Sequence, residues 1–243
     1  MLQKLVIAEV LLALMTISCG GSGEGVGAKP SAGLPTILVV GDSISQGRSI
    51  TESYRWWLAK ALTEAGVDVG FVGSQRTAFD GSGGHSNLRH EAYWGWTTDE
   101  ILARWGDEPP FDSVDIAIVH LGTNDLGQGE APSEVGVELT ALVALLRRTS
   151  PGIRVILFEP IPSSLAELDD LADLGAVVRE LALILDRPEA RVVSVDGRAG
   201  FDVERHTWDG VHPNERGAQA MAENLLPLVL LLAEERSGRE PKR

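Results

Sequence analysis

Apolar runs alternate with longer amphipathic stretches along most of this chain. Five runs are apolar almost throughout, as strands buried on both faces are: residues 36–41, 69–73, 114–122, 153–160 and 191–196. Apolar positions at helical spacing predict helices at residues 52–65, 97–105, 133–149 and 214–234, and a mostly helical stretch at 165–185. Strands that alternate with helices indicate a parallel sheet covered on both faces. We therefore predict an α/β, single-domain, flavodoxin-like three-layer sandwich with a central five-stranded parallel sheet.

The first residues do not follow this pattern. Lys4 precedes an apolar segment that is too short to span a bilayer comfortably, and a Gly/Ser-rich stretch follows it. Such a beginning is typical of a bacterial export signal and a flexible tether. We divide the chain into a signal, a linker, a folded domain and a charged C-terminal tail: residues 1–18, 19–35, 36–234 and 235–243.

Cys19 is the single cysteine of the chain, so no internal disulfide can form. Its place directly after the apolar segment resembles the acylation site of a lipoprotein. We predict an exported protein, either secreted or attached to the membrane of the cell envelope through lipidated Cys19. The alternative is an uncleaved N-terminal helix with a free thiol.

Composition narrows the possible partners. The 243 residues are 44% hydrophobic, which suits one domain with a sizeable core. The formal net charge is −14, and an acidic surface repels phosphate backbones, so no nucleic-acid partner is expected. The chain has neither a P-loop nor a Gly-x-Gly-x-x-Gly segment after a strand, and we predict no cofactor. No obligate protein partner is evident either.

Polar residues follow three of the predicted strands. In doubly wound sheets, ligands bind beyond the carboxyl ends of the strands. "GDS" at residues 41–43 follows the first strand, "GTND" at 122–125 follows the third, and "WDGVHPN" at 208–214 lies in the loop after the fifth. Taken alone, the first of these is more typical of a turn than of a nucleophile, so the other two must decide.

Together these strand ends hold the groups that acyl transfer requires: a nucleophile, a base, a group that orients the base, and oxyanion donors. Ser43 supplies a hydroxyl and His212 an imidazole. Asp209 precedes the histidine by three residues and can reach its other ring nitrogen. Asn124 supplies a neutral amide donor. Pro213 disfavours helical geometry at the histidine, which keeps that residue in the loop before the last helix.

Four motifs, in order, resemble the sequence blocks of the SGNH (GDSL-type) hydrolase superfamily: "GDSISQG", "WGWTTDEI", "GTND" and "DGVHPN". The resemblance spans nearly the whole predicted domain and implies the SGNH hydrolase fold. It implies Ser43 as nucleophile, His212 as base and Asp209 as the partner of the base. It also implies an oxyanion hole built from the Ser43 N–H, the Gly95 N–H and the Asn124 side chain.

A narrower resemblance concerns the substrate. The stretches "SYRWWLAKALTEAG", "FVGSQ" and "HEAYWGWTTDEI" are similar to the carbohydrate esterase group that includes acetylxylan esterases. This implies hydrolysis of short-chain (acetyl) esters, such as O-acetyl groups on xylan, through an acyl-enzyme. Three alternatives stay open: a lipase or thioesterase on the same site, an O-acetyltransferase, and a non-catalytic glycan-binding lipoprotein.

Some residues beside the motifs are candidates for binding the acylated carbohydrate or other small ester: Asp42, Arg55, His90, Trp94, Trp96 and Trp208. Each has a plainer alternative. The Asp42 side chain can form hydrogen bonds within its own turn, the Arg55 side chain can form a salt bridge, and the His90 side chain can form a hydrogen bond within its loop. The indoles can stack on sugar rings or only wall the cleft.

A metal site is the remaining alternative for the histidines. His206, Asp209 and His212 are spaced like ligands in one loop. Neither a His-Glu-x-x-His motif nor a cysteine cluster accompanies them, and we predict no metal.

Overall fold

The computed structural model describes residues 33–48, 52–76, 78, 88–107, 109–111 and 113–236. Their centre is a parallel sheet in the order β2-β1-β4-β5-β6. Its strands are β1 (Thr36–Gly41), β2 (Gly70–Val72), β4 (Ile116–His120), β5 (Arg154–Phe158) and β6 (Val192–Val195). A sixth strand, β3 (Glu91–Ala92), pairs in parallel with the end of β1, so the predicted count of five strands was one too low.

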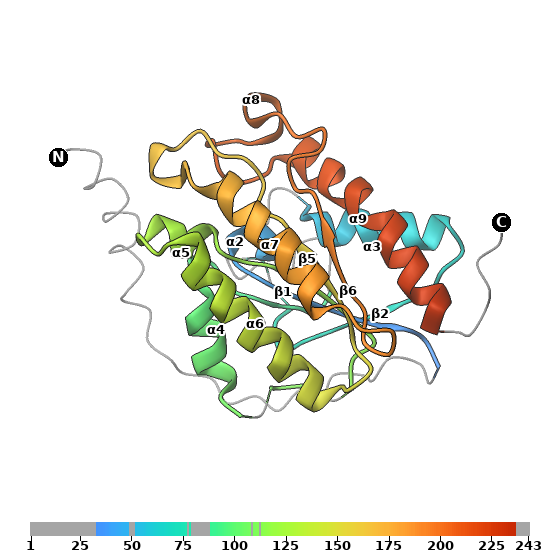
Figure 1. Cartoon of the computed structure of the whole chain (residues 1–243). Coiled ribbons are helices and arrows are strands. Elements are labelled where there is room, and N and C mark those ends of the chain that lie inside the picture. The colour runs from blue at the N-terminus through green and yellow to red at the C-terminus, as the bar shows by residue number, and fades with distance from the viewer. Residues whose placement is uncertain are drawn as a thin grey trace, which may run out of the picture.

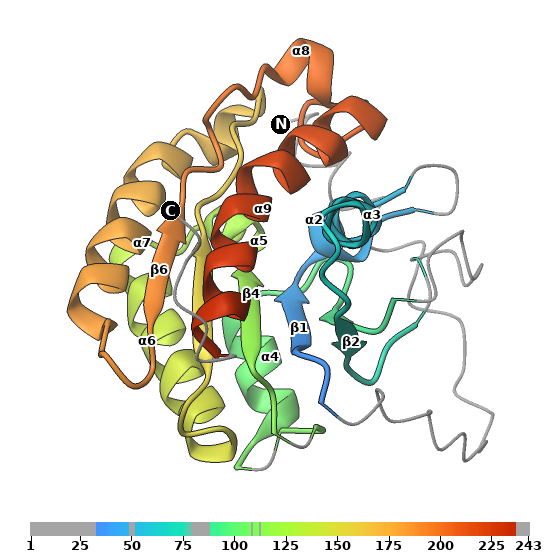
Figure 2. The same cartoon turned by 90° about the vertical axis from the view of Figure 1, so that its right-hand side faces the viewer.

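Helices cover both faces of this sheet (Figures 1 and 2). One face carries α3 (Tyr54–Glu64) and α9 (Glu215–Arg236), and the other carries α4 (Thr98–Trp105), α6 (Pro132–Thr149) and α7 (Leu171–Leu185). This arrangement confirms the predicted three-layer α/β sandwich. Short elements fill the connections: α2 (Ser43–Gln46), α5 (Thr123–Gly127), η1 (Ala166–Leu168) and α8 (Val203–His206).

Alternate side chains of the central strands pack on opposite helical layers. In β1, Leu38 and Val40 join the core beneath α4, α6 and α7, while Ile37 and Val39 join the core beneath α3 and α9. All four are 0% exposed. Because both faces of the strand are buried, the run is apolar without alternation, which is the pattern that predicted a parallel sheet.

Several boundaries differ from the predicted ones. The stretch at 165–185 is mostly helical, as predicted, but it consists of two elements: η1 is followed by Asp169 and Asp170 before α7 begins. The last helix continues to Arg236, past the predicted domain end at residue 234. Several predicted features lie outside the described residues: the export signal, Cys19, the linker up to residue 32 and the tail from residue 237.

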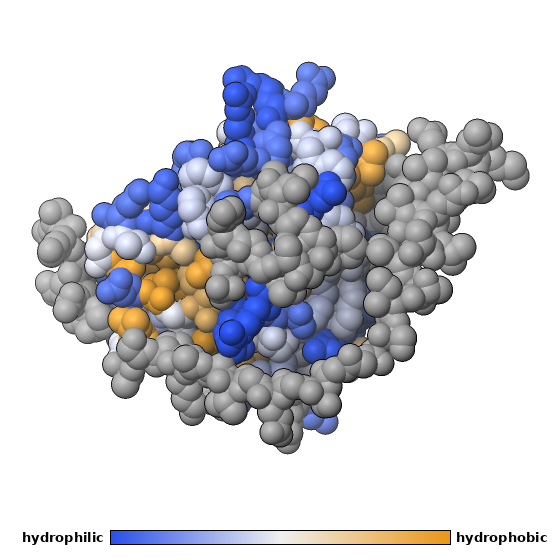
Figure 3. All heavy atoms as spheres, turned by 180° about the vertical axis from the view of Figure 1, so that it is seen from behind, coloured by the Kyte–Doolittle hydropathy of each residue, from blue (hydrophilic) through white to orange (hydrophobic). Residues whose placement is uncertain are grey.

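Hydrophilic and apolar side chains are unevenly distributed over the described surface. In the view from behind, hydrophilic side chains cover the upper part and an apolar area lies to one side (Figure 3). Within the described ranges, no helix has the length and apolar character needed to cross a bilayer. Exposed large apolar side chains such as Leu183 and Ile184 lie on helices, but Trp208 lies in the loop before α9, at the carboxyl edge of the sheet.

Candidate active site

Ser43 lies where β1 turns into α2. Asp42 caps this helix: its side chain accepts a hydrogen bond from the Ile44 N–H at 2.9 Å. Gly41 is required at the turn, because a Cβ there would lie 2.9 Å from the His120 carbonyl oxygen and closer still to Ser45. The turn places the Ser43 side chain at the carboxyl edge of the sheet. It also places the Ser43 N–H in the first helical turn, where backbone donors have no partner within the helix.

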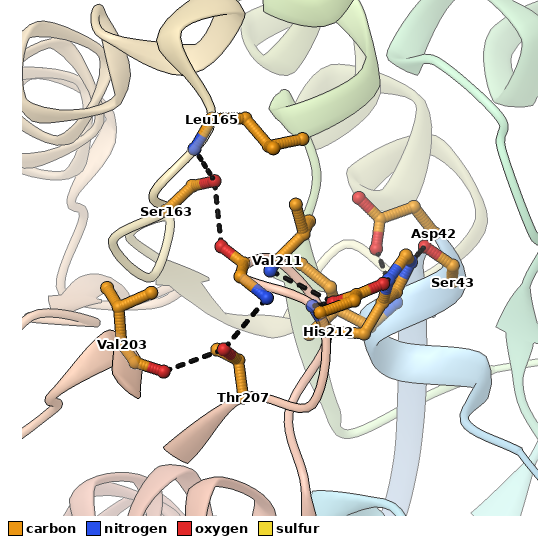
Figure 4. A network of polar contacts seen from close by, with 11 residues as sticks. Asp42, Ser43, Ser163, Leu165, Val203, Thr207, Val211 and His212 are labelled. Carbon is orange, nitrogen blue, oxygen red and sulfur yellow. Dashed lines mark hydrogen bonds and ion pairs between the residues drawn. The ribbon is translucent and has the colours of Figure 1, made fainter. Parts of the chain in front are cut away.

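His212 and Asp209 come to this serine from the loop before α9. The Ser43 Oγ lies 2.9 Å from His212 Nε2, and His212 Nδ1 lies 2.7 Å from Asp209 Oδ2. Figure 4 shows the imidazole pointing toward the serine. A carboxylate only accepts hydrogen bonds, so Nδ1 carries the proton and Nε2 accepts from the serine hydroxyl. The three predicted residues are therefore joined in one hydrogen-bonded series.

The Asp209 carboxylate is held as a charged acceptor. Desolvation acts to raise its pKa, but hydrogen bonds from the His212 ring, the His212 N–H and the Val211 N–H together lower it below its usual range. The two backbone bonds measure 2.7 and 3.0 Å. They fix the carboxylate relative to its own loop, which leaves Oδ2 directed at the imidazole.

Polar contacts also hold this loop in place (Figure 4). Gly210 adopts a positive φ of 89°, which favours glycine, and its carbonyl accepts from the Ser163 hydroxyl at 2.9 Å and the Ser164 N–H at 3.0 Å. Its own N–H donates to the Thr207 hydroxyl. Asn214 donates from its side chain to the Thr207 carbonyl and so closes the other end of the loop. These anchors keep the histidine in reach of the serine.

Two indoles stack on the imidazole of His212. The Trp94 ring lies 4.7 Å from it at 15°, and the Trp208 ring lies 5.4 Å from it at 17°, both measured between centroids. The Arg48 guanidinium lies 4.4 Å from the centre of the Trp208 ring. These side chains line a small pocket beside Ser43. The volume of this pocket that the centres of water-sized molecules can occupy is about 20 Å³.

The turn at residues 94–96 contains Gly95 and is hydrogen-bonded both to Asn124 and to α2, the helix that carries Ser43. The N–H of Trp94 donates to the Gln46 side chain in α2 at 2.7 Å, while the carbonyl of Trp96 accepts from Asn124 Nδ2 in α5 at 2.8 Å. Gly95, between the two, has a φ of 78°, and a Cβ there would meet nothing within 4 Å. Its backbone conformation, and not lack of space, favours glycine. An amide nitrogen has two N–H groups, so Asn124 keeps a second donor.

Asp42 is buried beneath the turn that carries Ser43. Its side chain is 0% exposed, and burial raises its pKa to about 7, although the Ile44 N–H and the charge of His212 lower it. The expectation of a substrate contact is therefore wrong, and the alternative of a capping residue holds. The carboxyl supports the turn from beneath.

Two further candidates are corrected in the same way. Arg55 is 2% exposed and donates to the carbonyls of Ser45, Gln46 and Leu88, so its guanidinium holds the loop segments around α2 together. His90 is 0% exposed, and its Nδ1 accepts from the Ala92 N–H at 3.1 Å. Neither side chain is open to a substrate.

The three tryptophans that were predicted to line the substrate site lie in two different environments. Trp94 and Trp208 line the pocket, as expected. The Trp96 ring instead stacks on Tyr93, with centroids 4.3 Å apart, and packs against the core without lining this pocket. Its carbonyl serves as the anchor for Asn124.

The metal interpretation of His206, Asp209 and His212 does not fit their geometry. Both ring nitrogens of His212 are engaged by Ser43 and Asp209. His206 Nδ1 accepts from the Asp202 N–H at 2.9 Å, at the base of α8. The three side chains do not converge on a common point among the described groups that could hold an ion.

Sequence reasoning missed several supporting residues. Gln46 lies within the first quoted motif, and its position there was the signal for a role, but its contact with the Trp94 N–H is nonlocal. Ser163 and Ser164 follow β5 and were passed over, because a serine pair in a loop carries no distinctive pattern. Arg48 directly follows the same motif and became visible only through its ring contact.

The fold and the site together are those of a carboxylic ester hydrolase. The chain belongs to the GDSL-like lipase/acylhydrolase family, whose sequence model matches residues 39–220.

Its relatives include esterases of known structure. An acetyl esterase, solved as a serine-to-alanine mutant with an acetate ion, is 25% identical, with a TM-score of 0.71, 84% of this chain covered and 100% of the other. A carbohydrate esterase family 3 protein from Talaromyces cellulolyticus is 26% identical, with a TM-score of 0.71 and coverage of 83% and 99%.

A multidomain esterase from Ruminococcus flavefaciens is 26% identical over 224 residues. The alignment covers 82% of this chain but only 29% of that protein, so the chain matches one part of a longer relative.

Proposed function

We propose that this protein is a serine esterase that removes acetyl groups from the hydroxyls of a carbohydrate, with xylan as the first candidate. The observation that carries the proposal is the hydrogen-bonded series of Ser43, His212 and Asp209, with contacts of 2.9 and 2.7 Å, at the carboxyl edge of the sheet. A binding protein has no need of a serine hydroxyl that donates to a histidine oriented by a carboxylate.

The mechanism follows from the protonation states of these groups. As Ser43 Oγ attacks the ester carbonyl, His212 Nε2 takes its proton, and the Asp209 carboxylate stabilises the imidazolium and keeps its tautomer. The oxyanion is held by the N–H of Ser43, the N–H of Gly95 and the second N–H of Asn124. His212 then returns the proton to the departing sugar oxygen, and water activated by the same histidine releases acetate from the acyl-enzyme.

The pocket beside the nucleophile favours a short acyl group. Trp94 and Trp208 flank it. The free volume that the centres of water-sized molecules can occupy is about 20 Å³, which is little more than a single water molecule requires. The relatives whose names refer to acetyl and carbohydrate esters support the same substrate class. A net charge of −14 also suits neutral glycans better than anionic lipid surfaces.

The test is a series of p-nitrophenyl esters of graded chain length, assayed beside acetylated xylan and a panel of other acetylated polysaccharides. We expect acetate to be the best acyl group, with rates that fall steeply as the chain lengthens, and acetic acid to be released from a glycan in the panel. An optimum at eight carbons or longer, with no acetate released from any glycan, would assign the site to a lipase or thioesterase.

The side chain that limits the length of the acyl chain can be tested separately. A hydrophobic pocket gains only about 1–3 kcal/mol per methylene, so steep rejection of long chains requires a wall, and we expect Trp94 to provide it. Trp94→Ala should raise the ratio of octanoate to acetate hydrolysis. Trp96→Ala is the matched control, because that ring stacks on Tyr93 away from the pocket. Equal ratios in both variants would show that the wall lies elsewhere.

We further propose that the protein is exported and partly held at the membrane through acylated Cys19. The apolar segment before Cys19 and the Gly/Ser-rich stretch after it support this. In a bacterial host, the wild-type protein should partition into detergent and Cys19→Ser should move to the aqueous fraction. A cytoplasmic protein with an intact N-terminus would contradict export.

A further inference from the structure

An arginine lies at the active-site pocket without an acidic partner. Arg48 is half-buried and lines this pocket together with Ser43 and His212. Its guanidinium lies 4.4 Å from the centre of the Trp208 ring. Within the residues that the structure describes, the Arg48 side chain forms neither an ion pair nor a hydrogen bond. It therefore offers a positive charge and five N–H donors to a ligand.

The acidic residue at the same pocket acts on a different arginine. Glu52 also lines the pocket and forms no ion pair with Arg48 among the described residues. Burial lowers the pKa of Arg55 to about 10, and the negative charge of Glu52 acts in the opposite direction. The charge of Glu52 thus supports the buried guanidinium of Arg55, and Arg48 is left as the cation that a ligand in the pocket can reach.

The sugar part of a bound ester lies near Arg48. The pocket has room for a short acyl group only, so a sugar ring attached to it must lie at the mouth of the pocket. His212 donates its proton to the departing sugar oxygen, which places the sugar beside the imidazole. The Trp208 ring stacks on this imidazole, is 47% exposed and also contacts the Arg48 guanidinium. A substituent on the sugar can therefore reach Arg48.

We propose that Arg48 binds a carboxylate on the sugar, so that the preferred substrate is an acetylated glycan that contains a uronic acid. This inference rests on the proposed esterase function and narrows its substrate class. A planar guanidinium binds a carboxylate through two parallel N–H···O bonds, and contact with the indole holds the guanidinium while its edge stays free to donate. The net charge of −14 does not prevent this, because charges farther away than about 8 Å are largely screened at physiological salt.

The test compares pairs of acetyl esters that differ only in one carboxylate. Methyl glucoside and methyl glucuronoside are each acetylated at one ring hydroxyl that the two sugars share, and acetate release is measured for every such pair. For at least one pair, kcat/KM should be about tenfold higher or more for the glucuronoside, as expected for a charge-assisted hydrogen bond. The difference should lie in KM, because Arg48 holds the carboxylate equally in the ground state and in the transition state.

Variants of Arg48 test the residue itself. Arg48→Gln removes the positive charge and the fork of N–H groups, so the kcat/KM values of the two esters should become nearly equal. Arg48→Lys keeps the charge without the fork and should give an intermediate preference. Arg187→Gln is the matched control, since Arg187 lies exposed between α7 and β6, at the amino edge of the sheet. It removes the same charge from the protein and should keep the wild-type preference.

The outcomes separate this inference from the proposed function. Equal kcat/KM values within every pair, with acetate released from both esters, would overturn the inference alone. So would a wild-type preference that persists in Arg48→Gln, or one that is lost equally in Arg187→Gln, which would assign it to the net charge of the protein. If p-nitrophenyl acetate is hydrolysed and no sugar ester is, the carbohydrate esterase proposal fails and the inference fails with it.

Discussion

Ser43→Ala is expected to fold normally and to lose ester hydrolysis by about 10³-fold or more. The serine contributes one hydroxyl to the site, and its loss leaves His212 Nε2 without the group from which it takes a proton. The rate is measured with p-nitrophenyl acetate and the fold by circular dichroism. Ser133→Ala, an exposed change in α6, is the control and should keep the wild-type rate. A serine-reactive phosphonate should label Ser43 and should fail to label Ser43→Ala.

His212→Ala should cost about as much as Ser43→Ala, because the two residues act as one unit. For the same reason, the double variant should be scarcely slower than either single one. Asp209→Asn should cost less, since the Asp209 loop keeps its backbone contacts. Losses that multiply in the double variant would mean that the serine and the histidine act independently. Full activity of Ser43→Ala would move the nucleophile to another residue.

Much of the fold was predictable because the central strands are buried on both faces. Ile37 and Leu38 face different helical layers, yet both need apolar side chains, so the strand leaves a continuous apolar run in the sequence. The same holds for Ile116 and Ala117 in β4. Family membership and the three-layer architecture follow from such runs together with the ordered motifs, and the family match confirms the recognition.

The missed elements share a physical cause. β3 has two residues, α2 has four and α5 has five, which is too short for a period of 2.0 or 3.6 residues to become visible. These elements form because neighbouring strands and loops hold them. The stretch from residue 165 to residue 185 is mostly helical, as predicted, but its helical residue types did not reveal that η1 and α7 are separate elements.

The candidate site was predictable where spacing is local and uncertain where contacts are distant. Asp209 and His212 lie three residues apart, so their pairing could be inferred from the chain alone. Arg55 and His90 lie beside the motifs, and proximity in sequence suggested a substrate contact. Their burial depends on Gln46, Leu88 and other residues brought in by the fold, and no local pattern reports it.

Asn124→Ala is expected to lower kcat for acetyl esters by roughly 10²–10³-fold, with KM nearly unchanged. The Asn124 side chain donates one N–H to the Trp96 carbonyl at 2.8 Å, which orients its second N–H. That second donor matters chiefly when negative charge develops on the ester oxygen, so its loss affects the transition state more than substrate binding. Asn224→Ala is the control, because Asn224 lies half-buried on α9, outside the four motifs, and donates to the Ala199 carbonyl.

The Asn124→Asp variant distinguishes stabilisation of the negative charge on the oxyanion from an effect of side-chain shape. The aspartate has nearly the same volume but offers no N–H, and its negative charge would repel the oxyanion. We therefore expect it to be at least as slow as Asn124→Ala, again through kcat. If either variant acts mainly on KM, Asn124 binds the ground-state substrate and the oxyanion is held by the backbone donors of Ser43 and Gly95. If Asn124→Asp keeps the wild-type rate, an amide donor at this position plays no part in the reaction.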